Sequence, residues 1–250
     1  IIYKNNDLLS ISDVEMRQIR GKDISMIFQE PMTSLNPVMT IGNQIAETLI
    51  THLNIPKKKA MDKAIELLKA VKIPAPEHRI KDYPHLLSGG MRQRVMIAMA
   101  IACNPSLLIA DEPTTALDVT IQAQIIELLQ TLRKKLNMAI LLITHDLSIV
   151  SEQADRVAIM YAGRIMELAE VDEIFQNPLH PYTIGLLESL PVARGITLKH
   201  IPGFVPQPDK LPYGCKYFDR CHRASKECNI AEPELKEVAK DHFVRCVKIN

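Results

Sequence analysis

Two adjacent carboxylates, Asp111 and Glu112, follow a short apolar run and are the strongest candidates for chemistry in this sequence. The run, 107–110, lies between turn residues and is typical of a parallel strand buried on both faces. Ligands of open α/β sheets bind beyond the carboxyl ends of such strands. An aspartate at this place suits Mg²⁺, directly or through water. A glutamate one residue later could orient and deprotonate an attacking water.

The turn Ser88-Gly89-Gly90 is a second candidate site, because it opens a predicted helix. The first N–H groups of a helix have no intrahelical acceptor and lie at the positive end of its dipole, so they attract anions, of which phosphate is the commonest. The two glycines allow a ligand to come close. Arg92 and Arg94 are expected to add positive charge to this site.

Two further polar residues stand directly after predicted strands. Gln29 follows the strand 24–28, and His145 follows the strand 139–144. On chemistry alone, a glutamine after a strand is more often a surface loop residue, and a lone histidine is more often structural than catalytic. His145, however, is expected at the same edge of the sheet as Asp111 and Glu112, which favours a functional role.

In this order, the segments resemble the motifs of ABC-type ATPases. LSGGMRQR (87–94) resembles the signature motif, LLIADEP (107–113) the Walker B strand with its glutamate, and TALD (115–118) the D-loop. The resemblance implies a Q-loop glutamine at Gln29, which reaches Mg²⁺ and the attacking water, and a switch histidine at His145, which contacts the γ-phosphate. It implies that Glu112, His145 and Gln29 are catalytic, that Ser88, Gly89, Gly90 and Asp118 bind ATP, and that Asp111 and Gln29 bind Mg²⁺.

The alternation of strands and helices predicts an α/β fold. By resemblance it is a P-loop-type ABC ATPase core, incomplete in this sequence, with a helical subdomain over about 35–102. We expect a partial nucleotide-binding domain over 1–170 and a C-terminal extension over 171–250. In the extension, prolines recur from residue 191 to residue 212 and predict an extended, linker-like path.

Four of the five cysteines lie in the last 36 residues. In a reducing cytosol, such a group favours metal binding over disulfides. The spacing C-x5-C-x6-C-x17-C lacks the close pair usual for structural zinc, whereas four thiolates from one irregular tail can hold a [4Fe–4S] cluster. We expect such a cluster as a folding staple, with Zn²⁺ or unmetallated thiols as open alternatives, at Cys215, Cys221, Cys228 and Cys246.

The tail also carries a more specific resemblance. HPYT (180–183), IPGFVP (201–206) and GCKYFDRC (214–221) resemble the C-terminal extension of oligopeptide and dipeptide importer ATPases, and TSLNPVMTIGNQIAE (33–47) resembles the same subfamily. Nickel and glutathione importers have similar tails and stay possible. The resemblance implies an ATP-binding, energy-coupling subunit, peripheral at the cytoplasmic face of the inner membrane. The implied partners are a second ATPase subunit (a copy or a paralogue), two transmembrane permease subunits and, indirectly, an extracytoplasmic peptide-binding protein.

Composition narrows the classes of protein. Apolar residues make up 47% of the chain and charged residues 24%, as in an ordinary globular protein. No apolar run approaches the roughly eighteen residues that span a bilayer, and no signal peptide is present, which points to the cytosol. The net charge of +1 gives no electrostatic support for a nucleic-acid partner.

The phosphate-gripping motif G-x-x-x-x-G-K-[ST] does not occur in these 250 residues. We therefore expect this polypeptide alone to bind ATP weakly and to hydrolyse it negligibly. A degenerate ABC module that acts as a non-hydrolysing interaction or regulatory subunit is the main alternative. An ABC ATPase that acts on DNA or ribosomes and an iron–sulfur electron-transfer protein are two further ones.

Overall fold

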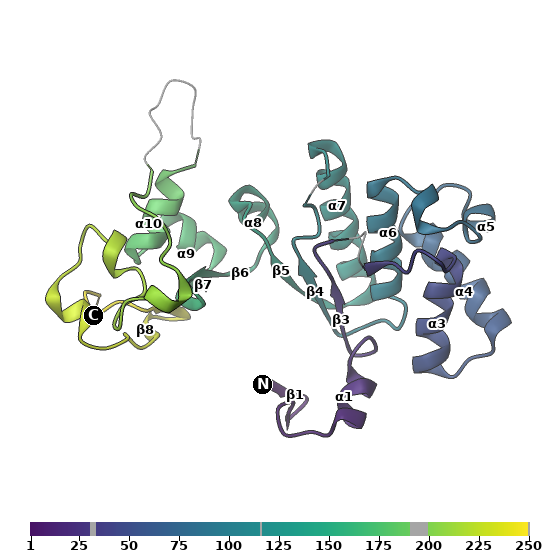
Figure 1. Cartoon of the computed structure of the whole chain (residues 1–250), viewed down its shortest axis with the longest axis horizontal. Helices are drawn as coiled ribbons and strands as arrows, with labels where there is room; N and C mark the ends of the chain where they lie inside the picture. The colour runs from purple at the N-terminus through teal and green to yellow at the C-terminus, as the bar shows by residue number, and fades with distance from the viewer. Residues whose placement is uncertain (31–33, 116, 191–199, 250) are drawn as a thin grey trace. The chain divides into compact units, whose positions relative to one another are not determined.

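The structure is a computed structural model of a chain with two compact units (Figure 1). One unit is Ile1–His145 and the other is Asp146–Asn250. The structure describes residues 1–30, 34–115, 117–190 and 200–249.

Some positions named in the sequence analysis lie outside the described residues. These are Thr33 at the start of the subfamily-like segment, Ala116 in the D-loop, and Pro191. The expected division into a nucleotide-binding domain over 1–170 and an extension over 171–250 stays a prediction. The compact units divide earlier, between residues 145 and 146.

A three-stranded parallel sheet lies at the centre of the N-terminal unit. Its strands are β3 (Ile24–Ile27), β4 (Leu107–Asp111) and β5 (Ala139–Ile143), in the order β3-β4-β5. The register pairs Ile27 with Ala110, and Asp111 with Ile143. The three strands therefore end at one common edge of the sheet.

Local sequence signals set the helix starts. A capping box begins the first helix, because the Glu15 N–H donates to the Ser12 hydroxyl and the Ser12 N–H donates to the Glu15 carboxylate. Thr40 caps the next helix by accepting from the Asn43 N–H. The remaining elements of the unit are β1 (Ile2–Tyr3), β2 (Asn6–Asp7), α1 (Asp13–Ile19), α3 (Ile41–Leu53), α4 (Lys57–Ala70), α5 (Pro76–Arg79), the 3-10 helix η1 (Pro84–Leu86), α6 (Gly89–Ala100) and α7 (Val119–Leu136).

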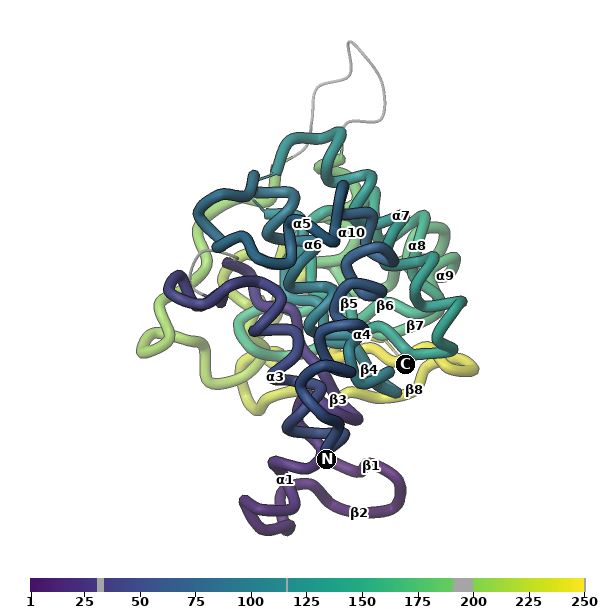
Figure 2. Tube along the Cα trace, turned by 90° about the vertical axis from the view of Figure 1, so that its right-hand side faces the viewer, coloured from purple at the N-terminus to yellow at the C-terminus, as the bar shows by residue number. Residues whose placement is uncertain are grey.

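The helices share one hydrophobic core with one face of the sheet. α3 and α4 lie side by side and pack against α6, as Figure 2 shows for the first pair. Ile45, Leu68 and Ile97 of these helices are fully buried in the cluster that also holds Leu108 of β4 and Leu128 of α7. This core positions the start of α6 and the carboxyl end of β4, which carry the candidate site residues.

The opposite face of the sheet is only partly covered within this unit, so the strand 107–110 is not buried on both faces as predicted: Leu107 and Ile109 are half-buried. Successive side chains of a strand point to opposite faces. Leu108 is fully buried on the helix side, whereas Leu141 and Ile143 of β5 are 52% and 45% exposed on the other side. The described residues of the unit place no second layer there, although parallel sheets are normally covered on both faces.

The C-terminal unit is built on a four-stranded antiparallel sheet in the order β6-β7-β9-β8. Two of its strands form a hairpin: β6 (Arg156–Tyr161) and β7 (Arg164–Glu170) are joined at Ala162 and Gly163, whose φ angles of 46° and 76° suit the tight turn of a twisted hairpin. The other elements are α8 (Leu147–Gln153), α9 (Val171–Gln176), α10 (Pro181–Glu188), the 3-10 helices η2 (Pro208–Lys210), η3 (Phe218–Arg220) and η4 (Lys226–Asn229), β8 (Lys236–Ala239) and β9 (His242–Val244).

The last two strands correct the expectation of a wholly irregular extension. β9 pairs with β7, where Leu168 lies opposite Phe243, and β8 pairs with β9. The extension therefore completes a sheet that begins in the preceding hairpin. This pairing explains why residues 156–170 belong to the C-terminal unit.

A buried ionisable pair joins the two parts of that sheet. The Glu167 side chain is fully buried, and its carboxylate lies 2.7 Å from Nε2 of His242. The same carboxylate accepts from the backbone N–H groups of Leu179, at 2.8 Å, and His180, at 3.0 Å. A buried carboxylate is tolerated because each of its oxygens is hydrogen-bonded in this way.

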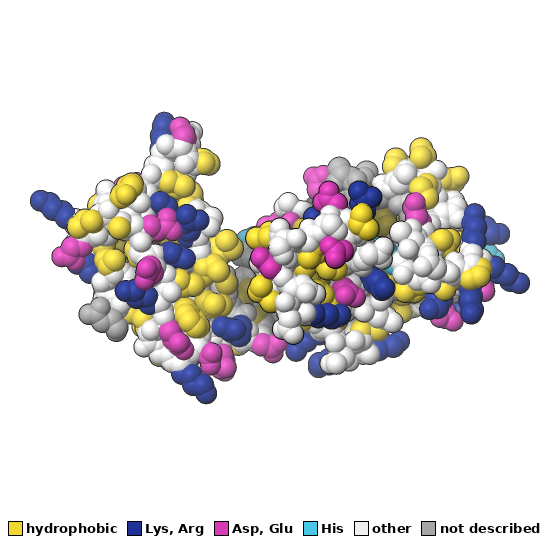
Figure 3. Space-filling model, turned by 90° about the horizontal axis from the view of Figure 1, so that it is seen from below, with side chains coloured by type: hydrophobic (Ala, Val, Ile, Leu, Met, Phe, Trp, Pro, Cys, Tyr) yellow, Lys and Arg dark blue, Asp and Glu magenta, His cyan; other side chains and the backbone are white. Residues whose placement is uncertain are grey.

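The first turn of α4 carries three lysines that face solvent. Lys57, Lys58 and Lys59 are exposed, and Figure 3 shows Lys and Arg side chains gathered at the end of the N-terminal unit that carries this helix. Among the described helices, none combines the length and apolar character needed to cross a membrane.

Gly42, in the first turn of α3, gives a test of this packing. A Cβ atom at this position would lie 2.2 Å from Cγ1 and 2.6 Å from the carbonyl oxygen of Ile80. We expect Gly42→Ala to lower the free energy of unfolding by about 1–3 kcal/mol, measured by chemical denaturation followed by circular dichroism. Gly89→Ala is the matched control, because its Cβ would meet Leu117 at an ordinary 3.6 Å. Equal stability of the two variants would contradict the close approach of α3 to Ile80.

Candidate functional site

The common strand edge brings three predicted residues together. Gln29 lies two residues beyond β3, Glu112 directly follows β4, and His145 lies two residues beyond β5. Nε2 of Gln29 donates to Oε2 of Glu112 at 2.7 Å, and Nδ1 of His145 lies 3.1 Å from Oε1 of the same carboxylate. The parallel register produces this arrangement, since it places the ends of the three strands level with one another.

The Glu112 carboxylate has a third donor that the sequence analysis missed. The hydroxyl of Thr115 donates to Oε2 at 2.8 Å. The hydrogen bond from Thr115 and then that from His145 lower the pKa of Glu112 most. Burial opposes them, and the hydrogen bond from Gln29 lowers the pKa by a smaller amount. The carboxylate is therefore ionised at neutral pH. The sequence signal for this donor is a threonine that lies three residues after Glu112.

The backbone also directs Glu112 toward this cluster. Its φ of 42° is in the left-handed region, which is costly for a residue other than glycine. Its N–H donates to the Ile143 carbonyl at 2.9 Å, and its own carbonyl accepts from the Thr115 N–H at 3.1 Å across a turn that contains Pro113. Such strain is typical of sites where a side chain must point in one particular direction.

His145 is fixed on one side and open on the other. Because a carboxylate can only accept, the Nδ1 atom that faces Glu112 carries the proton. The side chain is 78% exposed, so Nε2 remains accessible to a ligand. With Nδ1 protonated, Nε2 can donate to a phosphate oxygen only in the imidazolium form. Asp111, the predicted Mg²⁺ ligand, is a half-buried residue at the end of β4, and within the described chain its side chain forms no hydrogen bond or ion pair.

The Ser88 turn forms a separate part of the candidate site. The Ser88 hydroxyl accepts from the Met91 N–H at 3.3 Å and caps α6, which leaves the hydroxyl proton free for an anion. The N–H groups of Gly89 and Gly90 point out of the helix start. Gly90 packs closely on α7, since a Cβ there would lie 2.9 Å from Cγ2 of Ile121.

Asp118, predicted to bind ATP, caps the helix that begins beside the Ser88 turn. Its carboxylate accepts from the Ile121 N–H at 3.0 Å and caps α7. The signature turn and the start of α7 therefore lie side by side. The hydrogen bonds of Ser88 in the described chain are made within its own helix, so the structure groups Ser88 with the start of α7 rather than with the Glu112 cluster.

The guanidinium of Arg94 is engaged by other elements than the Ser88 turn, whereas the expected contribution of Arg92 to the charge at that turn stays a prediction. Nε of Arg92 donates to the carbonyl oxygen of Pro84 at 2.8 Å. Arg94 is buried, and it donates to the carbonyl oxygen of Val71 and the side chain of Gln124. Helical periodicity explains the difference for Arg94, which lies one turn into α6 on the face that packs against its neighbours.

The four cysteines of the extension do not form the predicted metal site. They line a common cavity of about 20 Å³, which holds about one water molecule. Burial raises the pKa of Cys215 to about 11 and also raises that of Cys221, so these thiols are protonated at neutral pH. Throughout the described chain, no group of three or more His, Cys, Asp or Glu side chains is arranged to hold a metal ion. The residues as placed therefore do not fit a [4Fe–4S] cluster or Zn²⁺.

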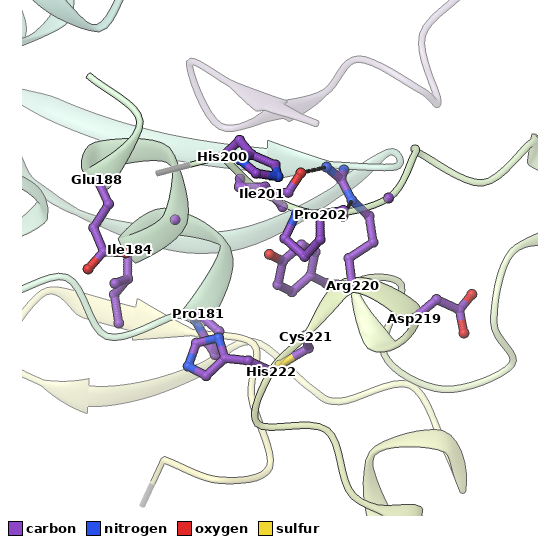
Figure 4. A pocket seen from close by; sticks show the side chains of 13 residues that line it. Pro181, Ile184, Glu188, His200, Ile201, Pro202, Asp219, Arg220, Cys221 and His222 are labelled. Carbon is purple, nitrogen blue, oxygen red and sulfur yellow. Dashed lines mark hydrogen bonds between the residues drawn. The ribbon is translucent and has the colours of Figure 1, made fainter. Parts of the chain in front are cut away.

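A larger cavity, of about 550 Å³, lies in the C-terminal unit (Figure 4). It lies between α10, residues 200–203 and the segment around η3. Arg220 holds one wall in place, because its guanidinium donates to the carbonyl oxygens of Ile201 and Pro202 at 3.2 and 2.8 Å. None of the residues of the Glu112 cluster or the Ser88 turn lines this cavity.

Two family models match the chain. The model described as ABC transporter matches residues 1–115, which include Gln29, Ser88 and Glu112. The model described as oligopeptide/dipeptide transporter, C-terminal region, matches residues 166–228. Both agree with the resemblance that the motifs and the tail carry.

Curated relatives and solved structures agree with the family models. The oligopeptide transport ATP-binding protein AppD of Bacillus subtilis is 56% identical over 248 residues, which are 98% of this chain and 76% of that protein. The dipeptide transport ATP-binding protein DppD of Haemophilus influenzae is 55% identical over 246 residues, which are 98% of this chain and 74% of that protein. The dimeric, post-hydrolysis ATP-binding cassette MJ0796 bound to ADP and Pi matches with a TM-score of 0.60 and 28% identity, over 68% of this chain and 72% of that one.

Removal of the Thr115 hydroxyl tests the environment of Glu112. We expect Thr115→Val to raise the pKa of the Glu112 carboxyl toward its ordinary value, because the charged form loses its strongest donor. The measurement is a titration of the side-chain carboxyl by carbon-13 NMR. Thr131→Val is the matched control, since the Thr131 hydroxyl donates to the carbonyl of Glu127 on α7. A Glu112 titration that is the same in both variants would contradict the assignment of Thr115.

Proposed function

This chain belongs to the ATP-binding subunits of ABC-type oligopeptide and dipeptide transporters, and from that premise we propose that it hydrolyses ATP at Glu112 to drive peptide import. It is an ABC-type ATPase by family. The observation that carries the residue assignment is the Glu112 carboxylate, bonded to Gln29 and His145 at the common end of three parallel strands.

Glu112 is proposed as the general base for the attacking water. Its lowered pKa keeps the carboxylate ionised, so it is ready to accept a proton. In the structure, both of its oxygens are engaged by Gln29, Thr115 and His145. Among the described residues, Oε1 has a single donor, His145, so the carboxylate keeps acceptor capacity for a water while Gln29, which is exposed two residues beyond β3, stays hydrogen-bonded to Oε2.

The other site residues are proposed to hold the nucleotide. Asp111, together with Gln29, offers the oxygen ligands that Mg²⁺ prefers, and bound Mg²⁺ would neutralise the charge on the phosphates. His145 would donate to the γ-phosphate through its exposed Nε2. Ser88, with the N–H groups of Gly89 and Gly90, would bind phosphate oxygens at the start of α6, and Asp118 would fix the adjoining turn.

The Ser88 turn is proposed to complete the ATP site of a second ATPase subunit, either a copy of this chain or a paralogue. The hydrogen bonds of Ser88 in the described chain lie within its own helix and none reaches the Glu112 carboxylate, which supports that arrangement. ATP binding would close the pair of subunits, and hydrolysis would open it. The Gln29 segment would pass the motion to two transmembrane permease subunits, which receive peptide from an extracytoplasmic binding protein. The chain would thus lie at the cytoplasmic face of the membrane.

The test is Glu112→Gln in the full-length protein assembled with its membrane partners. The amide is close in size to the carboxylate but cannot accept the proton, so we expect the rate of ATP hydrolysis to fall about 10²–10⁴-fold. Nucleotide binding should persist, as measured by retention of a fluorescent ATP analogue.

Glu127→Gln is the control, because this exposed glutamate lies on α7 away from the cluster. It should leave hydrolysis unchanged. Full ATP turnover by Glu112→Gln would refute the role of Glu112. An assembled wild-type complex that binds a membrane partner without turning over ATP would instead support a non-hydrolysing module.

A further inference from the structure

Arg94, on α6, is a buried cation without an acidic partner. It is 9% exposed. One guanidinium nitrogen donates to the carbonyl oxygen of Val71 at 2.9 Å, and another donates to Oε1 of Gln124 at 3.0 Å. Within the described chain, no carboxylate forms an ion pair with this side chain.

The stability of the fold does not account for this arrangement. Burial lowers the pKa of Arg94, which reflects the cost of removing its charge from water. Val71 caps the carboxyl end of α4, whose partial negative charge offsets only part of that cost. Buried charged groups can often be replaced by apolar residues of similar volume with no loss of stability. A methionine would therefore serve the core at least as well.

The two acceptors lie on different elements, so Arg94 bridges three helices. Its guanidinium, on α6, reaches the end of α4 through Val71 and the second turn of α7 through Gln124. A planar fork can satisfy two such acceptors in fixed directions at once, whereas the ammonium of lysine cannot.

The bridge sets the register between α6 and α7. Gly90, one turn before Arg94, packs against Ile121, nearly one turn before Gln124. The contacts advance together along both helices, so the helices run in the same direction with their starts at one end. Those starts carry the Ser88 cap of α6 and the Asp118 cap of α7.

We propose that Arg94 is a positioning residue for ATP hydrolysis, which holds the Ser88 turn in register with the start of α7 for the nucleotide of the facing subunit. The inference rests on the proposed function, because the Ser88 turn must contact nucleotide for its position to matter. In this proposal, Arg94 acts by fixing the position of the Ser88 turn, and its own charge does not contact the phosphate.

Hydrogen exchange of the full chain tests the geometric part without ATP. In Arg94→Met, we expect the amides of residues 88–92 and 118–121 to exchange about tenfold faster, at an unchanged or higher Tm. Ile97→Val, at a fully buried position on the same helix, is the matched control and should lower Tm without selective exchange at these two turns. Unchanged exchange at both turns in Arg94→Met would overturn the proposal.

ATP turnover by the assembled complex tests the functional part. We expect kcat to fall about tenfold in Arg94→Met, the effect of about 1.4 kcal/mol of lost transition-state stabilisation, with KM for ATP within about twofold of wild type. The kcat of Arg94→Lys should lie between those of wild type and Arg94→Met. Gln124→Leu, which removes one acceptor at an exposed position, should show a smaller fall in kcat and covers the case in which Arg94→Met does not fold.

The two proposals fail in different ways. If wild type turns over ATP and Glu112→Gln does not, the proposed function stands. Arg94 is then refuted as a positioning residue by a wild-type kcat in Arg94→Met, or by a fall in kcat no larger than that of Ile97→Val. If the wild-type complex does not hydrolyse ATP, the proposed function fails and the role of Arg94 fails with it.

Discussion

The parallel register of β3, β4 and β5 is the constraint on which the candidate site depends. Ile27 lies beside Ala110, and Asp111 lies beside Ile143, so residues that follow these strands must meet. Gln29 and His145 are 116 positions apart in sequence, yet both bond to one carboxylate. A slip of one residue would turn each strand's side chains to the other face and separate them. The helical core fixes this register by packing Leu108 against α6 and α7.

The Glu112 side chain is held in place by an unfavourable backbone conformation and by several hydrogen-bond donors. Its backbone is held at a φ of 42°, and its carboxylate is surrounded by donors. The donors lower the pKa, which keeps the group ionised but also makes it a weaker base. A change at Gln29 or His145 would therefore alter the basicity of Glu112.

Residues that stand at the ends of regular elements were predictable, and residues that act across elements were not. Gln29, Glu112 and His145 follow apolar runs, and Ser88 precedes one, so strand and helix signals locate them. Arg94 carries no such signal, because its role depends on which neighbours folding brings near. Thr115 is local to Glu112, but a threonine three residues after a glutamate is too common a pattern to identify a donor. The short strands β8 and β9 were missed since pairing with β7, rather than their own sequence, makes them strands.

The two buried charged side chains of the described chain, Glu167 and Arg94, differ in how their charges are compensated. Glu167 accepts from two backbone N–H groups and faces His242, so its charge is met within one unit at the junction of β7, β9 and α10. Arg94 has only a carbonyl oxygen and an amide oxygen, without an opposite charge. A group that only filled the core would not need a charge so incompletely matched. Arg94 fixes the orientation of α6 relative to both α4 and α7. That orientation matters because the first turn of α6 carries Ser88.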